Sequence, residues 1–343
     1  MTIFFLDGNT TIMKKLLNYK TAVLAAAVFL IITALAGCTK DNRVSKTALK
    51  LDTVVTITLY GNYDAKCIDS AFAEIDRLSA LLDVNDEGSE LYKLAENAGE
   101  WIDISHETAE VLGLAQEYYD LSGGYFDVTA APLVELWNVN GGGYFPTEAE
   151  IANAAALVDG SQLQLNGSKA RLGMSGMKAD LGGVAKGYIA DKVKEHLTGL
   201  GVKHAVIDLG GNVALLGTKP DGSPYNVGVK DPLDKDGKLL TTITGSDESM
   251  VTSGIYERYF EHEGKRYHHI IDPFTGAPSE SDLAGVTIVS QNSAQADALS
   301  TACLLLGSED ALELIEKIDG AEALLVTREG EIYKSSGMAD RVR

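Results

Sequence analysis

Apolar residues recur along the chain in two patterns, one typical of strands and one typical of helices. The stretch 53–60 (TVVTITLY) is rich in β-branched residues and predicts a strand, whereas 65–82 and 106–121 carry apolar residues at helical spacing. Further strands are expected at 163–172 (a hairpin with Asn166-Gly167 at its turn), 205–209, 213–216, 225–229, 239–244, 286–289, 323–327 and 331–334. Further helices are expected at 132–137, 147–158, 183–197, 293–306 and 309–318. No regular βαβ order appears, so the predicted fold class is α+β.

Near the N-terminus, the pattern changes to that of an export signal. Lys14, Lys15 and Lys20 precede an apolar run without a charge, residues 21–37, and the run ends directly before Cys38. Basic residues, a short apolar run and small residues before a cleavage site are the parts of a secretory signal peptide. The run is also shorter than the roughly 20 residues that span a bilayer comfortably. We therefore expect the chain to be exported.

The sequence Leu35-Ala36-Gly37-Cys38 resembles the bacterial lipobox, in which the cysteine is lipidated and becomes the new N-terminus. Lipidation at Cys38 would hold the chain at the extracytoplasmic face of a bacterial membrane. An uncleaved membrane anchor and a plain secretory signal with an incidental cysteine are the alternatives. Residues 1–12 fit poorly in front of a signal, so translation is expected to start at Met13. The predicted organisation is a signal peptide at 1–37, the lipidated cysteine and a tether at 38–48, and a folded domain at 49–343.

Composition and charge narrow the function classes. The 343 residues carry a formal net charge of −20, and 45% of them are hydrophobic. A nonspecific nucleic-acid binder is disfavoured, because neutralising phosphates needs a basic surface. An anionic ligand would need local compensation from a lysine, a helix N-terminus or a metal. Cys67 and Cys303 remain after processing; two buried thiols are favoured over a disulfide, and no cluster of cysteine and histidine indicates zinc.

Two segments contain residue types that suit an anionic ligand and a metal. In Asp180-Leu-Gly-Gly-Val-Ala-Lys186, two glycines precede a predicted helix whose first turn holds Lys186, and such a helix start favours phosphate. A purely structural glycine turn is the alternative. In the helix predicted at 293–306, Ser293 is expected as the N-cap, and Asp297 and Thr301 lie four positions apart on one face. These two can hold a hard cation such as Mg²⁺. The alternative is a solvated carboxylate and a threonine bonded to the helix backbone.

Two further segments carry a candidate base and candidate ring contacts. His268 and His269 lie at the end of a predicted strand that enters a tight turn, and a histidine there can act as a general base near neutral pH. A structural role for at least one of them is the alternative. Tyr125 and Phe126 can stack on a planar ring, and Asp127 can accept a hydrogen bond from its polar edge. Core aromatic residues explain the same stretch equally well.

In this order, the segments resemble the ApbE family of flavin transferases. The resemblance covers about 51–307 and is carried by TVVTITLY, GYFDVTAAPLVELW, DLGGVAKGYIAD, VIDLGGN, VTSGIYERYF, GKRYHHIIDPFTG and ADALSTACLLLG. It implies a single two-lobed domain in which mixed or antiparallel sheets are flanked by helices, so that 49–343 is the flavin transferase domain. It also implies the reaction: the FMN moiety of FAD is transferred through a phosphoester bond to a Thr or Ser hydroxyl of an acceptor protein, with release of AMP.

The resemblance assigns roles position by position. Asp180 and Lys186 match residues that contact FAD, and the stretch Tyr125-Phe126-Asp127 matches a contact on the flavin side. Ile270 completes the predicted FAD-binding residues, and His269 directly before it matches the candidate base, with Asp180 as a second predicted catalytic residue. The predicted Mg²⁺ ligands are the backbone carbonyl of Gly183 and the side chains of Asp297 and Thr301.

The chain departs from the family at two places. Its first strand begins with Leu51-Asp52-Thr53 where the family usually has Met-Gly-Thr. Asp83-Val84-Asn85 replaces a turn that often holds an aromatic residue beside the flavin, so the stacking partner is not assigned. The implied partners are FAD, acceptor flavoproteins of membrane electron-transfer systems, and the membrane through the lipid anchor, with no nucleic acid. A Mg²⁺-dependent FAD pyrophosphatase that gives FMN and AMP, and a non-catalytic flavin-binding lipoprotein, are the alternatives.

Overall fold

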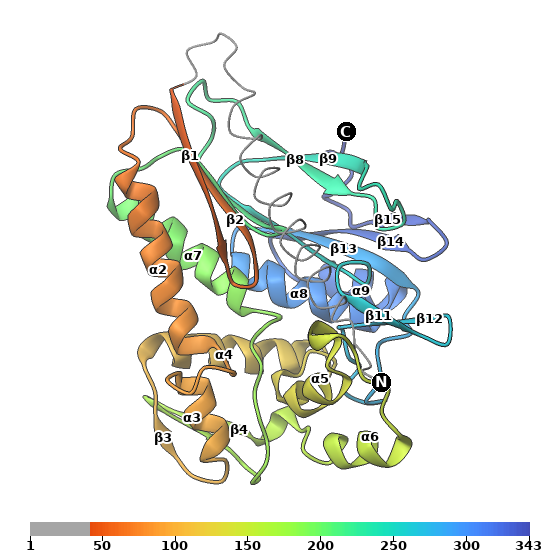
Figure 1. Cartoon of the computed structure of the whole chain (residues 1–343). Helices are drawn as coiled ribbons and strands as arrows, with labels where there is room; N and C mark the ends of the chain where they lie inside the picture. Colours follow the sequence, from red (N-terminus) through yellow and green to blue (C-terminus); the bar gives the residue numbers. More distant parts are fainter. Residues whose placement is uncertain (1–41) are drawn as a thin grey trace, which may run out of the picture. The chain divides into compact units, whose positions relative to one another are not determined.

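An eight-stranded sheet runs through the part of the chain that the computed structural model describes, residues 42–343 (Figure 1). Its spatial order is β1 (Arg43–Lys50), β2 (Thr53–Tyr60), β6 (Ala205–Leu209), β7 (Asn212–Leu216), β10 (Ser249–Gly254), β13 (Leu283–Ser290), β14 (Ala321–Thr327) and β15 (Ile332–Lys334). Every pair of neighbours is antiparallel. All eight residues of β13 are buried, which places the centre of the sheet between two covering layers.

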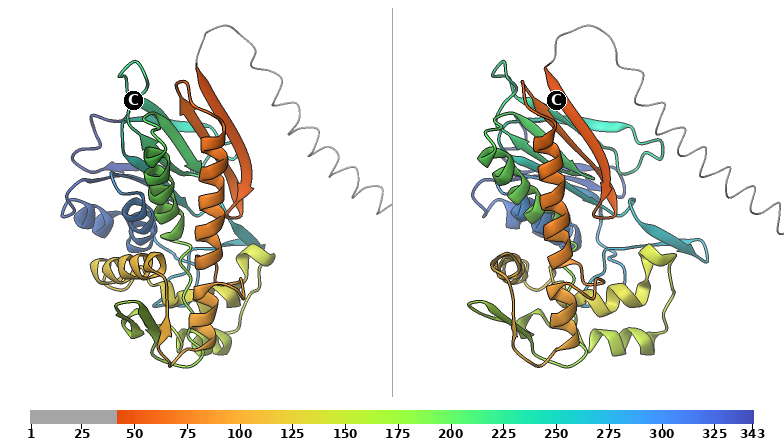
Figure 2. Two further views of the ribbon diagram at one scale, coloured as in Figure 1. Left: turned by 90° about the vertical axis from the view of Figure 1, so that its left-hand side faces the viewer. Right: turned by 60° about the vertical axis from the view of Figure 1, so that its left-hand side comes forward.

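Helices cover one face of this sheet (Figures 1 and 2). They are α2 (Lys66–Leu82), α7 (Ala185–Gly199), α8 (Ser293–Leu306) and α9 (Ser308–Ile315). Helix α8 packs on β10 and β13, and α7 packs between α2 and α8. The apolar side chains of both layers form the largest core cluster, which includes Ile57, Ile75, Val193 and Leu299. Burial of these apolar surfaces is the main contribution to the stability of the layer.

The other face of the sheet is covered by a two-stranded hairpin, β8 (Tyr225–Lys230) and β9 (Leu239–Gly245). Leu215, Met250 and Val289 of the sheet meet Tyr225 and Ile243 of the hairpin in a second core cluster. The C-terminal segment closes this layer, because Val342 bridges to Ile243. The sheet is therefore covered on both faces over its central strands.

A smaller lobe lies at the end of the large helices and completes the described region (Figure 1). Its elements are α3 (Glu90–Glu96), β3 (Ile102–Asp103), α4 (His106–Leu121), η1 (Val128–Ala130), α5 (Ala131–Trp137), η2 (Val139–Gly141), α6 (Glu148–Ala155), η3 (Gly160–Gln162), β4 (Leu163–Asn166) and β5 (Lys169–Leu172). The hairpin of β11 (Tyr259–His262) and β12 (Lys265–His268) joins this lobe to the sheet. Its Phe260 and Tyr267 stack with each other and pack against Trp137 of α5.

The predicted α+β class is confirmed, and of the two arrangements expected for the sheets the antiparallel one is found. The tether predicted at 38–48 is wrong from Arg43 onward, because residues 43–50 form β1 and pair with β2 along their whole length. Ionic contacts to α2 hold this edge strand, from Lys46 to Asp69 and from Lys50 to Asp76. The hairpin predicted at 163–172 is present, although Asn166 pairs with Lys169 and the turn residues are Gly167 and Ser168.

Both cysteines of the described region are free thiols, so the disulfide is not formed; Cys303 is buried and Cys67 is half-buried. The predicted signal peptide at 1–37, the expected start at Met13 and the lipidation site at Cys38 lie outside the described residues. Within residues 42–343, no helix combines the length and the apolar character needed to span a bilayer.

Gly187 is a point of very close packing between α7 and α8. A Cβ atom at this position would lie 2.3 Å from the carbonyl oxygen of Ser293 and 2.7 Å from Cβ of Asp297. We expect Gly187→Ala to lower the free energy of unfolding by about 2–3 kcal/mol, because a backbone neighbour cannot yield cheaply to an added methyl group. Urea denaturation of the two proteins measures this difference.

Gly199, the last residue of the same helix, provides the matched control. No heavy atom outside its own surroundings lies within 4 Å of an added Cβ atom at Gly199. Gly199→Ala should therefore leave stability unchanged or raise it slightly, since alanine has the higher helix propensity. Equal stability of Gly187→Ala and the wild type would contradict the close approach of the two helices.

Candidate active site

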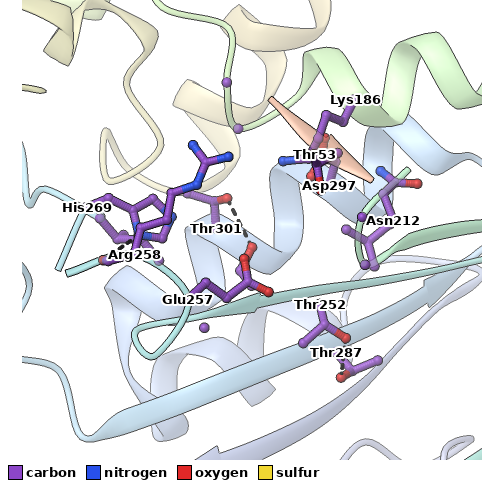
Figure 3. Close-up of a pocket in the computed structure, with 18 of the residues that line it drawn as sticks. Thr53, Lys186, Asn212, Thr252, Glu257, Arg258, His269, Thr287, Asp297 and Thr301 are labelled. Atoms are coloured by element: carbon purple, nitrogen blue, oxygen red, sulfur yellow. Dashed lines mark hydrogen bonds between the residues drawn. The ribbon is translucent and has the colours of Figure 1, made fainter. Parts of the chain in front are cut away.

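A cavity of about 850 Å³ opens between the sheet, the start of α7, one face of α8 and the smaller lobe (Figure 3). The ten residues predicted from the sequence to form a site in the folded domain all line it. They are Tyr125, Phe126, Asp127, Asp180, Gly183, Lys186, His269, Ile270, Asp297 and Thr301. These residues are spread over more than half of the chain, and the topology alone brings them to one place. Their individual roles remain predictions.

Asp297 lies on the inner face of α8 and is 3% exposed. The backbone N–H of Gly187 donates to its Oδ2 atom over 2.8 Å, so the start of α7 is joined directly to this carboxylate. The N-cap of α8 is Asn292, whose side chain accepts from Gln295 N, so the prediction of Ser293 as the cap is wrong. The Ser293 hydroxyl instead donates to Oδ1 of Asn212 over 2.8 Å.

That contact orients the Asn212 amide toward Asp297 (Figure 3). Since Ser293 occupies the amide oxygen, the nitrogen Nδ2 faces the carboxylate, and Nδ2 is buried without a partner in normal hydrogen-bond geometry among the described residues. Burial raises the pKa of Asp297, while the charge of Lys186 and the hydrogen bond from Gly187 act in the opposite direction. Burying a charged carboxylate costs free energy unless a cation or a metal ion lies beside it.

Thr301 lies one helical turn after Asp297 and also lines the cavity. Its hydroxyl oxygen is 3.5 Å from the hydroxyl of Ser253 in β10. A Cβ atom at Gly183 would lie 3.5 Å from the same oxygen and 2.9 Å from the Phe126 ring. Glycine at 183 therefore lets the loop before α7 pass close to Thr301. The backbone of this loop brings further oxygen atoms beside the side chains of Asp297 and Thr301.

Asp180 and Lys186 flank that loop. The backbone N–H of Gly182 donates to Oδ1 of Asp180 over 2.8 Å, so the carboxylate shapes the turn. Burial raises the pKa of Asp180, and the bond from Gly182 and the charge of Lys186 oppose this. Lys186 acts electrostatically on Asp180, Asp297 and His269 alike, which makes it a central cation of the cavity.

The sequence left two interpretations open for Tyr125, Phe126 and Asp127, namely contacts to a planar ring and packing in the core. The structure differs from residue to residue. Phe126 is 3% exposed and packs edge-on against Tyr118, as a core residue does. Asp127 accepts from Thr129 N, from the Thr129 hydroxyl and from Gly160 N, so its carboxylate mainly holds its own loop. Tyr125 is half-buried and pairs edge-to-face with the exposed ring of Phe274, at 4.9 Å between centroids.

The two histidines at the end of β12 have different surroundings. His268 is 5% exposed, and its Nε2 lies 3.0 Å from the carbonyl oxygen of Ser279. His269 lines the cavity, and its Nδ1 lies 3.2 Å from the carbonyl oxygen of Arg258. Because a carbonyl can only accept, Nδ1 of His269 carries the proton and Nε2 keeps a free lone pair. Burial lowers the pKa of His269 to about 4, so the ring is neutral at pH 7.

His268 gives a testable dependence of stability on pH. Burial lowers its pKa to about 4 from the usual 6.5. The unfolded chain therefore binds more protons than the folded chain between these values, and the free energy of unfolding falls as the pH is lowered through this window. A shift of this size corresponds to about 3 kcal/mol across the window, and to about 2 kcal/mol by pH 5. Urea denaturation at pH 7 and pH 5 should show a smaller loss in His268→Gln than in the wild type; identical losses would contradict the burial of a neutral ring.

Comparison with known proteins decides the family. The family model described as the ApbE family matches residues 51–325. The chain belongs to the ApbE family. The FAD:protein FMN transferase of Treponema pallidum (strain Nichols) is 33% identical over 328 residues, which cover 90% of this chain and 91% of that protein. The FAD:protein FMN transferase of Klebsiella pneumoniae (strain 342) is 34% identical over 301 residues, covering 86% of this chain and 93% of that protein.

Solved structures of ApbE proteins share the fold. The ApbE protein from Thermotoga maritima superposes with a TM-score of 0.81 at 28% identity, over 88% of this chain and 99% of that one. The flavin transferase ApbE from Vibrio cholerae gives a TM-score of 0.79 at 25% identity, over 87% of this chain and 99% of that one. The predicted ApbE-like fold, family and enzyme class, a flavin transferase, are thereby confirmed.

Sequence reasoning missed several residues of the cavity wall. Arg258 directly precedes β11 and holds His269 through its carbonyl oxygen, and Glu257 lies beside it. Ser253 of β10 contacts Thr301, and Asn212 of β7 faces Asp297. The first three lie in VTSGIYERYF, a segment that marked the family but carried no assigned residue. The charged pair Glu257-Arg258, which follows the glycine that ends β10 after two intervening residues, was the signal available there.

Proposed function

We propose that this ApbE-family chain transfers the FMN moiety of FAD to a Thr or Ser hydroxyl of an acceptor protein, releases AMP, and depends on Mg²⁺. The observation that carries the proposal is the meeting of Asp297, Thr301 and the Gly183 loop beside Lys186, with the neutral ring of His269 in the same cavity. One side of the cavity thus suits a metal-bound pyrophosphate, and the other offers a base for a hydroxyl.

The donor set fits Mg²⁺ by its chemistry. One carboxylate, one hydroxyl and a backbone carbonyl are hard oxygen donors, and Mg²⁺ keeps several waters and substrate oxygens beside few protein ligands. The residues 42–343 hold no group of three or more His, Cys, Asp or Glu side chains placed to bind a metal, so a softer transition-metal site is not supported there. Bound at these oxygens, Mg²⁺ would supply positive charge that offsets the charge of the pyrophosphate.

Lys186 and the start of α7 bind the same anion. The helix dipole favours negative charge at this end, although the N–H groups of Ala185 and Gly187 are already bonded to Leu181 O and to Oδ2 of Asp297. Lys186 is the second residue of α7 and adds a mobile ammonium group. Asp180 and Gly182 fix the loop that leads into the helix, which keeps the helix start in place before the substrate arrives.

His269 takes the proton of the acceptor hydroxyl. The hydroxyl oxygen attacks the phosphorus of the FMN half, a new P–O bond forms, and the P–O bond to the AMP half breaks, so that AMP leaves with the bridging oxygen. Nε2 accepts the hydroxyl proton, because Nδ1 is already protonated toward the Arg258 carbonyl oxygen. The hydrogen bond to the Arg258 carbonyl oxygen also fixes the plane of the His269 ring, so the lone pair of Nε2 points in a fixed direction.

The location of the chain belongs to the same proposal. A lipidated Cys38 would keep the domain at the extracytoplasmic face of a bacterial membrane, beside membrane electron-transfer flavoproteins that serve as acceptors. Support for this comes from the basic, apolar and small residues that precede Cys38 in the sequence. Mass spectrometry of the mature N-terminus from membranes tests it, since an unmodified or uncleaved N-terminus would exclude a lipid anchor.

One assay separates the candidate activities. The purified chain is incubated with FAD, Mg²⁺ and an acceptor domain that carries a Ser/Thr-Gly-Ala-Ser/Thr segment, and flavin fluorescence on the acceptor is read in a denaturing gel. Acceptor fluorescence with an equal amount of AMP is the expected result. Free FMN and AMP without labelled acceptor would instead identify an FAD pyrophosphatase. Bound FAD that persists after Mg²⁺ is added would identify a flavin-binding lipoprotein.

A further inference from the structure

The two-residue turn that joins β1 to β2 is held in an unfavourable conformation at the mouth of the cavity. Lys50 pairs with Thr53, so the turn consists of Leu51 and Asp52, whose φ angles are 53° and 54°. Such left-handed conformations favour Asn, Asp or Gly in tight hairpins and are uncommon for a leucine. Residues held in sparsely populated backbone regions cluster at functional sites.

The surroundings show which residue the turn presents. Leu51 is half-buried and packs against the main core cluster, so its side chain fixes the orientation of the turn. Asp52 is exposed and lines the cavity. The adjacent Lys50 is occupied by Asp76, with its Nζ 2.6 Å and 2.7 Å from the two carboxylate oxygens. Among the described residues, no cation forms an ion pair with Asp52, so its carboxylate is available at the cavity mouth.

An apolar pair lies directly beside this carboxylate. Leu49 of β1 and Val54 of β2 are opposite each other in the register, and their side chains share one face of the hairpin. Leu49 is 83% exposed and Val54 is 53% exposed, and Val54 lines the cavity. Leu49 and Val54 thus add exposed apolar area next to the carboxylate of Asp52 at the rim of the cavity.

We propose that the tip of the β1–β2 hairpin, residues 49–54, is the contact surface for the acceptor protein, and that Asp52 selects acceptors with a basic side chain near the reacting hydroxyl. This inference rests on the proposed transfer to an acceptor protein. The pyrophosphate of FAD is not the partner of Asp52, because it is anionic and is repelled by a carboxylate. A lipid bilayer also suits an exposed Leu–Val pair, but it would have to take up Asp52 as well, at a high cost.

Paired acceptors test the charge selection with the full chain in detergent. Two versions of the acceptor domain carry either Lys or Glu two residues from the reacting hydroxyl. The wild type should label the Lys version with a KM roughly fivefold lower than the Glu version, the size expected for an ion pair at the rim of an interface, and the preference should fade at high salt. Asp52→Asn should remove the preference through the acceptor KM and not through the KM for FAD.

Two further substitutions separate recognition from backbone effects. Asp52→Gly should also remove the preference, and it should raise the urea midpoint of unfolding because glycine relieves the left-handed conformation. Leu49→Ser should raise the acceptor KM for both versions about threefold, by removing apolar contact area. Leu239→Ser is the matched control, since Leu239 is 61% exposed on β9 and does not line the cavity, and its labelling kinetics should equal those of the wild type.

The outcomes distinguish this inference from the function on which it rests. Equal KM values for the two acceptors, together with wild-type kinetics of Asp52→Asn and Leu49→Ser, would overturn the inference and leave the transfer activity standing. Conversion of FAD to FMN and AMP with neither acceptor labelled would overturn both. A membrane test uses the Leu49→Trp chain bound to vesicles of phosphatidylethanolamine and phosphatidylglycerol. The fluorescence emission of the introduced tryptophan should shift to the blue, as on burial, only after the Lys acceptor is supplied. A blue shift before that addition would assign the tip to the membrane and overturn the inference.

Discussion

Replacing Asp297 with alanine is expected to abolish the release of AMP from FAD, with turnover at least about 1,000-fold below that of the wild type at millimolar Mg²⁺. Asp297 is a buried carboxylate close to the point where Thr301 and the Gly183 loop meet. Loss of its charge removes the strongest donor for the metal that offsets the pyrophosphate charge, and several kcal/mol of transition-state stabilisation depend on that charge. Chromatographic measurement of AMP and FMN over a Mg²⁺ titration checks the result.

Asp297→Asn separates this effect from a structural one. The Asn side-chain oxygen can still accept from Gly187 N, the bond that joins α8 to α7, so this variant should keep the fold while losing activity. Thr301→Ala should have a smaller effect, about 10- to 100-fold, because a neutral hydroxyl is the weaker donor. Near-normal turnover of a folded Asp297→Ala protein at ordinary Mg²⁺ would remove the metal assignment.

The sequence predicts the parts of this site better than their arrangement. Helix α8 is predicted with its bounds because apolar residues recur along it, and Asp297 and Thr301 then share a face by helical spacing alone. Nothing in that spacing shows that Asp297 is buried or that Gly187 donates to it. The burial of Asp297 and its hydrogen bond from Gly187 follow from the packing of α7 on α8, and helical spacing within one segment does not specify that packing.

Sequence reasoning missed more than one strand, β1 at the sheet edge among them, and the missed strand beside the site is the one most dependent on context. β10 (SMVTSG) combines Ser, Thr and Gly with only two large apolar residues, so its own propensity is weak. It becomes a central strand because β7 and β13 lie on either side and α8 covers it. The polar side chain of Ser253 is then carried to Thr301. Polar residues in a central strand favour a functional position, and Ser253 is the missed site residue that this missed strand carries.

Replacing His269 is the second change with a large expected effect. The acceptor hydroxyl must lose its proton as it attacks phosphorus, and a positioned base contributes roughly 10²–10⁴-fold to such a step. His269→Ala should therefore lower the rate of acceptor labelling by about this factor, with little change in the affinity for FAD. Single-turnover labelling under saturating FAD and acceptor measures the step, and fluorescence titration of FAD measures the affinity.

His269→Asn sharpens the test, because its side-chain nitrogen can replace Nδ1 toward the Arg258 carbonyl oxygen but offers no counterpart of Nε2. A loss as large as that of His269→Ala would place the effect on Nε2, and added imidazole should restore part of the labelling in the alanine variant by entering the vacated volume. The pKa of about 4 predicts that the wild-type rate has no fall from His269 between pH 8 and pH 5, since the ring is neutral throughout. Near wild-type labelling by His269→Asn would show that the acceptor hydroxyl is deprotonated elsewhere. Glu257, a carboxylate that lines the same cavity, would then become the group to replace next.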